Sequence, residues 1–307
     1  MPRLPLSSLT SAALLSLLAG STGCATRPAV DEHTVHVVPA PAPATTPVPA
    51  TAASGALPPG ANDASARLAA SPRHGEWVMI PTSPGASDSV RAWVVYPERA
   101  TKAPVVVVVH EIFGLSTWIR AVADQLAADG FIAIAPDMLT GKRPTSSPDT
   151  PPDSAPALVR SLTNDEIQRY LDAVARHGRA LPASNGRYGI VGFCWGGGVV
   201  WAHAAHAGAA LGAGVSYYGP TTSAGDFTAV RAPILGLYGS DDARVNSTVP
   251  RADSTMRALG RTFGHETFSG AGHGFLRQQD GRNGANLAAT QGAWPRTIAW
   301  FRQHLGG

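Results

Sequence analysis

Apolar runs separated by helix-like stretches recur along residues 73–307. The longest run, 105–109, is five consecutive valines with no alternation of polar and apolar positions. A strand of this kind is apolar on both faces, which is typical of the centre of a parallel sheet covered on both sides. Six further stretches have strand-like patterns, at 76–80, 90–96, 131–135, 188–191, 214–218 and 234–238.

Helical patterns lie between these predicted strands. Thr163 and Glu166 have the spacing of a capping box, and apolar residues then follow at one-face spacing up to Gly178, where we expect the helix to end. Ser116 begins a similar pattern that stops at Gly130. Because strands and helices alternate, the sequence predicts an α/β fold with a mostly parallel central sheet and helices on both faces. Its active site should lie at the carboxyl ends of the strands.

The first residues have the pattern of an export signal. Arg3 supplies a positive start, residues 9–20 form a short apolar core, and small residues lead up to Cys24. The core is too short to span a bilayer as a helix. Residues 1–24 therefore predict a signal peptide whose ending resembles a bacterial lipobox, with Cys24 as the lipidated first residue of the mature chain. Simple cleavage without lipid is the alternative. Either way we expect an exported protein of the periplasm or cell envelope. The lipidated form would be in contact with a membrane only through its N-terminal lipid anchor.

The next segment, residues 25–72, is rich in Ala, Pro and Thr and has neither a helical nor a strand period. Such a segment cannot bury enough apolar surface to offset the entropy lost on ordering. We expect a disordered tether over 25–72 and a single globular domain over 73–307.

Composition narrows the function classes. The net charge is +3, from 24 basic and 21 acidic residues, and no run of Lys or Arg suggests a nucleic-acid surface. No His, Cys and Asp cluster with ligand spacing suggests a metal, and no G-x-G-x-x-G suggests a nucleotide, so no cofactor is predicted. The chain has only two cysteines, so loss or lipidation of Cys24 leaves Cys194 without a disulfide partner. The sequence gives no signal for an oligomeric state.

The segment GFCWGGG (192–198) follows an apolar strand and leads into a small-residue helix. This is the pattern of a nucleophile elbow, G-x-S-x-G, with Cys194 in the position of the serine. A helix N-terminus favours a thiolate, which would make Cys194 a nucleophile. The structural alternative is a small apolar residue buried under the helix.

Partners for such a nucleophile follow in chain order. Asp242 comes after the 234–238 strand in a G-x-x-D-x-x-V spacing, and the neighbouring Asp241 is the fallback. His273 lies between two glycines, in a loop that suits a general base. Nucleophile, acid and histidine in this order are typical of an α/β-hydrolase. The oxyanion would need two amides, the first from Trp195 and the second from the loop 110–114.

Six motifs together resemble the dienelactone hydrolase family. They are HEIFGL (110–115), APDM (135–138), GFCWGG (192–197), YYG (217–219), GSDD (239–242) and GHGF (272–275). The resemblance covers about residues 75–305 and implies an α/β-hydrolase fold. It also implies a Cys-His-Asp triad of Cys194, His273 and Asp242, with oxyanion amides from Ile112 and Trp195.

The resemblance further implies two charged roles. Glu111 would hold the resting thiol neutral until substrate displaces it, since an anion beside a thiol raises the thiol pKa. Arg277 would bind a substrate carboxylate through its guanidinium group. The structural alternatives are a salt-bridged acid and a surface arginine. The family's second carboxylate-binding arginine and its nearby tyrosine have no counterpart in SSPDTPPD (146–153).

The sequence therefore predicts a cysteine-dependent hydrolase of small activated esters or enol-lactones that works through an acyl-enzyme. One alternative is a general carboxylesterase or thioesterase with an apolar pocket lined by Phe113, Trp118 and Trp195. The other is a non-catalytic binding protein of the cell envelope on a hydrolase fold. The complete set of Cys194, Asp242, His273 and Glu111 favours the enzyme.

Overall fold

The computed structural model of the protein describes residues 56–142 and 153–306. The predicted signal peptide, its Cys24 and the predicted tether up to residue 55 lie outside the described residues. Among the described residues, no helix combines the length and the apolar character that crossing a bilayer requires.

Eight strands of the described residues form one sheet, in the order β1-β2-β4-β3-β5-β6-β7-β8. The strands are β1 (Gly75–Pro81), β2 (Ser89–Val95), β3 (Ala103–Val109), β4 (Ile132–Pro136), β5 (Ser184–Phe193), β6 (Ala213–Tyr217), β7 (Ile234–Asp241) and β8 (Phe263–Gly272). β2 runs antiparallel to both of its neighbours, and all other neighbouring pairs are parallel. The sheet is thus mostly parallel, as predicted, and the carboxyl ends of β3 to β8 meet at one edge.

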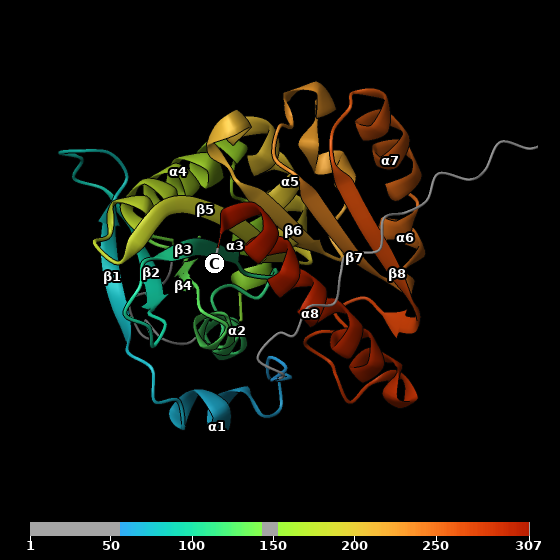
Figure 1. Cartoon of the computed structure of the whole chain (residues 1–307), viewed down its shortest axis with the longest axis horizontal. Coiled ribbons are helices and arrows are strands. Elements are labelled where there is room, and N and C mark those ends of the chain that lie inside the picture. The colour runs from blue at the N-terminus through green and yellow to red at the C-terminus, as the bar shows by residue number, and fades with distance from the viewer. Residues whose placement is uncertain (1–55, 143–152, 307) are drawn as a thin grey trace, which may run out of the picture. The chain divides into compact units, whose positions relative to one another are not determined.

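Helices cover both faces of this sheet (Figure 1). They are α1 (Ala64–Ala69), α2 (Thr117–Ala128), α3 (Ala155–Arg160), α4 (Asn164–Ala180), α5 (Trp195–Ala207), α6 (Ala243–Asn246), α7 (Val249–Ala258) and α8 (Ala285–Leu305). The valine run of β3 shows why two layers are needed. Val106 and Val108 belong to one core with residues of α2 and α8, whereas Val105, Val107 and Val109 belong to a second core with residues of α4 and α5. Successive side chains of a strand point to opposite faces, so each core receives every second valine.

β8 is the strand that the hydrophobic pattern did not predict. Most of its residues between 263 and 270 are half-buried or exposed, and only its last two positions are buried. The strand lies at the edge of the sheet and pairs with β7 alone. An edge strand needs no continuous apolar run, which is why the pattern missed it.

α4 begins as predicted and ends later than predicted. The Thr163 amide donates to the Glu166 carboxylate at 2.8 Å and the Glu166 amide donates to the Thr163 hydroxyl at 3.2 Å, which completes the capping box. The helix continues past Gly178, so the expected stop there is wrong. A Cβ at Gly178 would lie 2.8 Å from Ile134 and from Val105, so the glycine lets the helix pack directly on the sheet.

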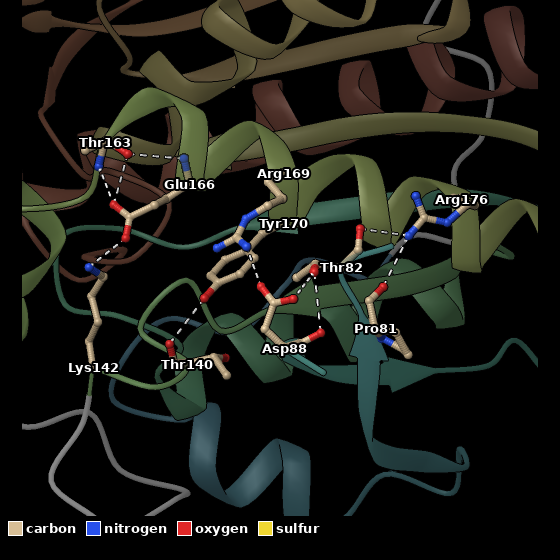
Figure 2. Close-up of polar contacts among 10 residues, drawn as sticks. All are labelled: Pro81, Thr82, Asp88, Thr140, Lys142, Thr163, Glu166, Arg169, Tyr170 and Arg176. Atoms are coloured by element: carbon tan, nitrogen blue, oxygen red, sulfur yellow. Dashed lines mark hydrogen bonds and ion pairs between the residues drawn. The ribbon is translucent and has the colours of Figure 1, made fainter. Parts of the chain in front are cut away.

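Polar contacts tie α4 to the connection between β1 and β2 (Figure 2). Arg169 forms an ion pair with Asp88, and Arg176 donates to the carbonyl oxygens of Pro81 and Thr82 at 3.2 Å and 3.0 Å. Exposed ion pairs contribute little stability one by one. These contacts fix where the helix crosses the antiparallel end of the sheet.

The end of the predicted tether is ordered, which corrects the prediction for residues 56–72. This segment contains α1, and the side chains of Leu57 and Leu68 pack against the core. Arg67 donates to the side-chain oxygen of Gln125 on α2 at 3.0 Å. The few apolar residues of this segment thus bury their side chains against the core, and that burial offsets the conformational entropy lost when the segment is ordered.

Candidate active site

Cys194 lies on a sharp turn between β5 and α5. Its φ of 56° and ψ of −114° are outside the regions that most non-glycine residues occupy. The turn is possible only because glycines flank it: a Cβ at Gly192 would lie 2.0 Å from the Gly196 carbonyl oxygen, and one at Gly196 would lie 2.5 Å from that of Val109. The segment forms the strand-turn-helix elbow that its sequence predicts.

Asp242 and His273 meet at the carboxyl edge of the sheet. Asp242 directly follows β7 and His273 directly follows β8, and these strands are parallel neighbours. The His273 ring nitrogen Nδ1 lies 2.5 Å from the Asp242 oxygen Oδ2, and the Asp242 side chain is almost fully buried. The fallback acid Asp241 is instead exposed and pairs with Arg282. The structure therefore brings His273 together with Asp242.

The Cys194 thiol contacts the two amides that the sequence analysis singled out. The backbone N–H groups of Trp195 and Ile112 both interact with the thiol and favour its anionic form. Ile112 follows β3, and Trp195 is the first residue of α5. Because these two N–H groups converge on one sulfur, they also lie close to the position that the carbonyl oxygen of a substrate attached to that sulfur would occupy.

The surroundings of the thiol nonetheless favour its neutral form. Burial raises the pKa of Cys194 above its ordinary value, and the negative charge of Glu111 raises it further. The amides of Trp195 and Ile112 and the charge of Arg244 act in the opposite direction. Burial dominates, so the helix N-terminus does not by itself produce a thiolate here.

Glu111 is a buried carboxyl group, with 4% of its surface exposed. Burial raises its pKa to about 7, and the nearby Arg277 guanidinium limits that rise. The Arg277 atom Nε lies 3.4 Å from Glu111 Oε2, and the guanidinium carbon lies 5.0 Å from the centre of the Phe113 ring. Arg277 is therefore held over the Glu111 loop by an ion pair and a cation–π contact.

Two residues of this edge were not assigned a role from the sequence. Tyr218, at the end of β6, is fully buried with φ 42°, and its hydroxyl has no hydrogen-bond partner among the described residues. Its ring lies 5.1 Å from that of His273, and it interacts electrostatically with Cys194 and Glu111. Tyr218 therefore contacts the histidine and lies near enough to the thiol to interact with it. Its place directly after a buried strand was the available signal.

His110 is the second residue that was missed. It is fully buried at the end of β3, and its ring stacks on Trp195 with centroids 5.5 Å apart. Its Nδ1 donates to the Glu111 carbonyl oxygen at 2.7 Å, and its Nε2 accepts from the Met138 amide at 3.3 Å. Both nitrogens are thus occupied, which fixes the loop that carries Glu111 and Ile112.

The side chains of Ile112 and Trp195 pack against a small, fully buried apolar cluster of Leu139 and the α3 residues Ala155 and Val159. Of the other aromatic residues expected to line a pocket, Phe113 is exposed beneath Arg277. Trp118 is instead buried and packs edge-on against Phe193 in the core, which corrects its assignment to a pocket.

No group of three or more His, Cys, Asp or Glu side chains that could hold a metal ion occurs among the described residues.

Comparisons with known proteins identify the family of the chain. Residues 90–305 match the model of the dienelactone hydrolase family. The chain is 32% identical over 241 residues to a "Putative carboxymethylenebutenolidase" of Methylorubrum extorquens, and the match covers 74% of this chain and 80% of that protein.

Solved structures confirm the predicted α/β-hydrolase fold. The structure of a "Putative Dienelactone Hydrolase" from Klebsiella pneumoniae has a TM-score of 0.64 and 29% sequence identity, and the match covers 75% of this chain and 99% of that one. A dienelactone hydrolase from Anabaena variabilis has a TM-score of 0.58 at 21% identity, with 76% and 98% of the two chains covered. The second likeness bears on the fold alone.

Proposed function

Because the chain belongs to the dienelactone hydrolase family, whose members are hydrolases of esters and lactones, we propose that it cleaves small activated esters or enol-lactones with Cys194 as nucleophile. The observation that carries this proposal is the meeting of two arrangements at one sheet edge. One is the His273–Asp242 pair at 2.5 Å, and the other is the thiol held against the amides of Ile112 and Trp195.

The proposed reaction has two halves. In the first, His273 takes the thiol proton, the Cys194 sulfur attacks the substrate carbonyl, and the developing oxyanion accepts hydrogen bonds from the Ile112 and Trp195 amides. The C–O bond to the leaving group then breaks, and His273 returns the proton to the departing oxygen. The product of this half is a thioester on Cys194, with Asp242 stabilising the transient imidazolium.

In the second half, water cleaves the thioester. His273 takes a proton from the water, the hydroxide attacks the thioester carbonyl, and the same two amides bind the oxyanion. The C–S bond breaks, the carboxylic acid leaves, and the Cys194 thiol is restored by the proton from His273. No redox change occurs and no co-reactant besides water is needed.

Glu111 controls when the thiol is activated in this scheme. With no substrate bound, its charge opposes thiolate formation, and Arg277 is paired with it. A substrate carboxylate that pairs with Arg277 would compete for the guanidinium and displace Glu111 from the thiol. The nucleophile would then form only when a substrate is in place, which limits adventitious oxidation of an exported thiol.

A second candidate is a general carboxylesterase or thioesterase, favoured by the partly exposed apolar side chains of Ile112 and Trp195 beside the two amides. Such side chains suit an acyl or alcohol group without charge. The two candidates differ in whether Arg277 contributes to substrate binding.

The proposal is tested with the full chain and its Cys194→Ala and Cys194→Ser variants on a carboxylated enol-lactone, a neutral aryl ester and a thioester. We expect turnover by the native protein, its loss in Cys194→Ala, and its loss on alkylation by iodoacetamide. Turnover that survives complete labelling of Cys194 would overturn the thiol mechanism. If none of the three substrates is cleaved, the non-catalytic binding protein is the better interpretation.

We also propose that the chain is exported and anchored through a lipid on Cys24, as the N-terminal sequence pattern predicts. Mass spectrometry of the mature protein tests this: a lipidated Cys24 at the N-terminus supports the anchor. An unmodified N-terminus downstream of residue 24, in a protein found in the soluble periplasmic fraction, would indicate simple cleavage.

A further inference from the structure

Residues 58–62, which we call the clasp, lie against the loop that follows β8 although more than 200 positions separate them in the chain. The Ala61 amide donates to the Arg277 carbonyl oxygen at 2.8 Å, and the Gln279 side-chain amide donates to the Pro58 carbonyl oxygen at 2.9 Å. The Asn62 side-chain amide donates to the Asp280 carboxylate at 2.8 Å. The clasp thus forms hydrogen bonds with Arg277, Gln279 and Asp280.

The clasp and the residue before it are also hydrogen-bonded to α2 and α1. The buried Trp118 of α2 donates its indole N–H to the Pro59 carbonyl oxygen at 2.9 Å. Arg67 of α1 donates both to the Leu57 carbonyl oxygen and to Gln125 of α2, each at 3.0 Å. The loop after β8 therefore contacts a segment that is itself hydrogen-bonded to α2.

Arg277 needs such support because its own segment is a turn. Its amide donates to the Gly274 carbonyl oxygen at 3.0 Å, and Gly274 has φ 79°. The guanidinium must nonetheless reach Glu111, with Nε 3.4 Å from Oε2. A small rotation of this turn would carry the guanidinium away from the carboxylate, because the side chain is long.

We propose that the clasp is a positioning segment: its hydrogen bonds to Arg277 and Gln279 hold the guanidinium against Glu111 and so set the state of the site before substrate binds. The proposal rests on the proposed function for its consequence, which is selectivity for carboxylated substrates. The clasp precedes the 90–305 region that matches the family model, so it is a feature of the chain outside the matched region.

The geometry predicts a change in one titration. Among the described residues, Arg277 from the loop after β8, Cys194 from the elbow and Tyr218, which follows β6, interact electrostatically with Glu111. The neighbouring His110 ring is hydrogen-bonded to the Glu111 carbonyl oxygen. Of these, only Arg277 is a cation, and it lowers the pKa of Glu111. Loss of the clasp should therefore raise the pKa of Glu111, in the same direction as loss of Arg277 itself.

The experiment uses Ala61→Pro in the full chain, which removes the N–H that donates to Arg277. The pKa of Glu111 is read from the side-chain carboxyl ¹³C shift of glutamate-labelled protein, with Glu111→Gln to assign the resonance. We expect an upward shift of about one pH unit or less, since a half-exposed arginine is partly screened. With a carboxylated lactone we expect a higher KM, and with a neutral aryl ester an unchanged KM.

Matched variants separate positioning from general stability. Ser65→Pro places the same residue in the exposed first turn of α1, where no contact to the 274–280 loop is lost, and should leave the pKa of Glu111 unchanged. Gln279→Leu removes the second bond to the clasp without a backbone change, together with the bond from the same amide to the Leu276 carbonyl oxygen, and should shift the pKa of Glu111 in the same direction as Ala61→Pro. It also keeps the test open if Ala61→Pro fails to fold.

A double-variant cycle gives the decisive result. In an Arg277→Ala background, Ala61→Pro should raise the pKa of Glu111 no further, because both changes act through the same guanidinium. If Ala61→Pro and Gln279→Leu lower only the free energy of unfolding and leave the pKa at its native value, the clasp is structural and the proposal is wrong. The titration needs no turnover, so its outcome is independent of whether the protein cleaves esters or lactones.

Discussion

The His273 ring donates from Nδ1 to the Asp242 carboxylate across 2.5 Å, which leaves Nε2 as the nitrogen that can exchange a proton with another group. The pair comes from the ends of two parallel neighbouring strands, β7 and β8. Its geometry is therefore set by the pairing of the sheet and is not left to a loop alone.

The first prediction concerns the choice between the two adjacent aspartates. Asp242→Asn should lower kcat by about 10³- to 10⁴-fold, because the neutral amide no longer fixes the histidine tautomer or stabilises the imidazolium. Asp241→Asn is the matched control: this side chain is exposed and bonded to Arg282, so kcat should stay within about twofold of native. Steady-state turnover of an aryl ester measures both. The opposite ranking would make Asp241 the acid.

The second prediction concerns the resting thiol. Glu111→Gln removes the anion that raises the pKa of Cys194, so the thiol should ionise at lower pH. The lower pKa should speed alkylation by iodoacetamide near neutral pH severalfold, because the thiolate is the reacting form. The exposed Glu98→Gln variant should react at the native rate. If Glu111→Gln slows alkylation or leaves it unchanged, Glu111 does not control the thiol.

The same carboxyl group has a consequence for stability. The pKa of Glu111 in the folded protein is about 7, above its ordinary value of 4.5, so the folded chain binds this proton more tightly than the unfolded chain. Stability from this group is present below about pH 4.5 and is lost as pH rises through about 7. The loss is on the order of 3 kcal/mol for a group this deeply buried.

Urea unfolding of native protein and Glu111→Gln at about pH 4.5 and about pH 8 checks this prediction. The free energy of unfolding of the native protein should fall relative to that of the variant as pH increases. Other titrating groups cancel in the difference between the two proteins. A difference that is independent of pH would show that Glu111 titrates alike in the folded and unfolded chain.

Particular residues show which features of the fold and the site could be predicted from the sequence. The elbow at Cys194, the capping box at Thr163 and the valine core of β3 are local patterns, and each could be predicted because its geometry depends on neighbouring positions alone. The pairing of Asp242 with His273 could be predicted too, from the chain order of nucleophile, acid and histidine, although strand β8 was not predicted.

The features that were missed depend on distant contacts. The order of residues 56–72 comes from Trp118 and Gln279, which no local pattern connects to that segment. In the sequence Tyr218 reads as part of a strand, and only the structure shows its ring against that of His273. β8 has no apolar run because it pairs with one strand alone. The late end of α4 reflects the close approach of Gly178 to the sheet.

The fourth prediction tests the close packing under the elbow. Gly196→Ala should abolish activity and lower the free energy of unfolding by about 2 kcal/mol, since the new methyl group would lie 2.5 Å from the Val109 carbonyl oxygen. The clash displaces the first turn of α5 and with it the Trp195 amide. Gly264→Ala is the matched control, because its methyl group would meet Trp300 and Leu235 at 3.5 Å or more. Turnover and urea unfolding of both variants decide the matter, and an active Gly196→Ala would contradict the proposed elbow.

The last prediction separates the two candidate functions through Arg277. If the guanidinium binds a substrate carboxylate, Arg277→Ala should raise KM for a carboxylated lactone by about 10- to 100-fold, the usual range for one charged hydrogen-bonded pair. KM for a neutral aryl ester should change by less than about threefold, because such an ester has no carboxylate to pair with the guanidinium. Arg257→Ala, which removes an exposed arginine paired within α7, controls for the change in net charge. Equal loss on both substrates would mean that Arg277 holds Glu111 in place without selecting the substrate, and the general esterase would then be the better description.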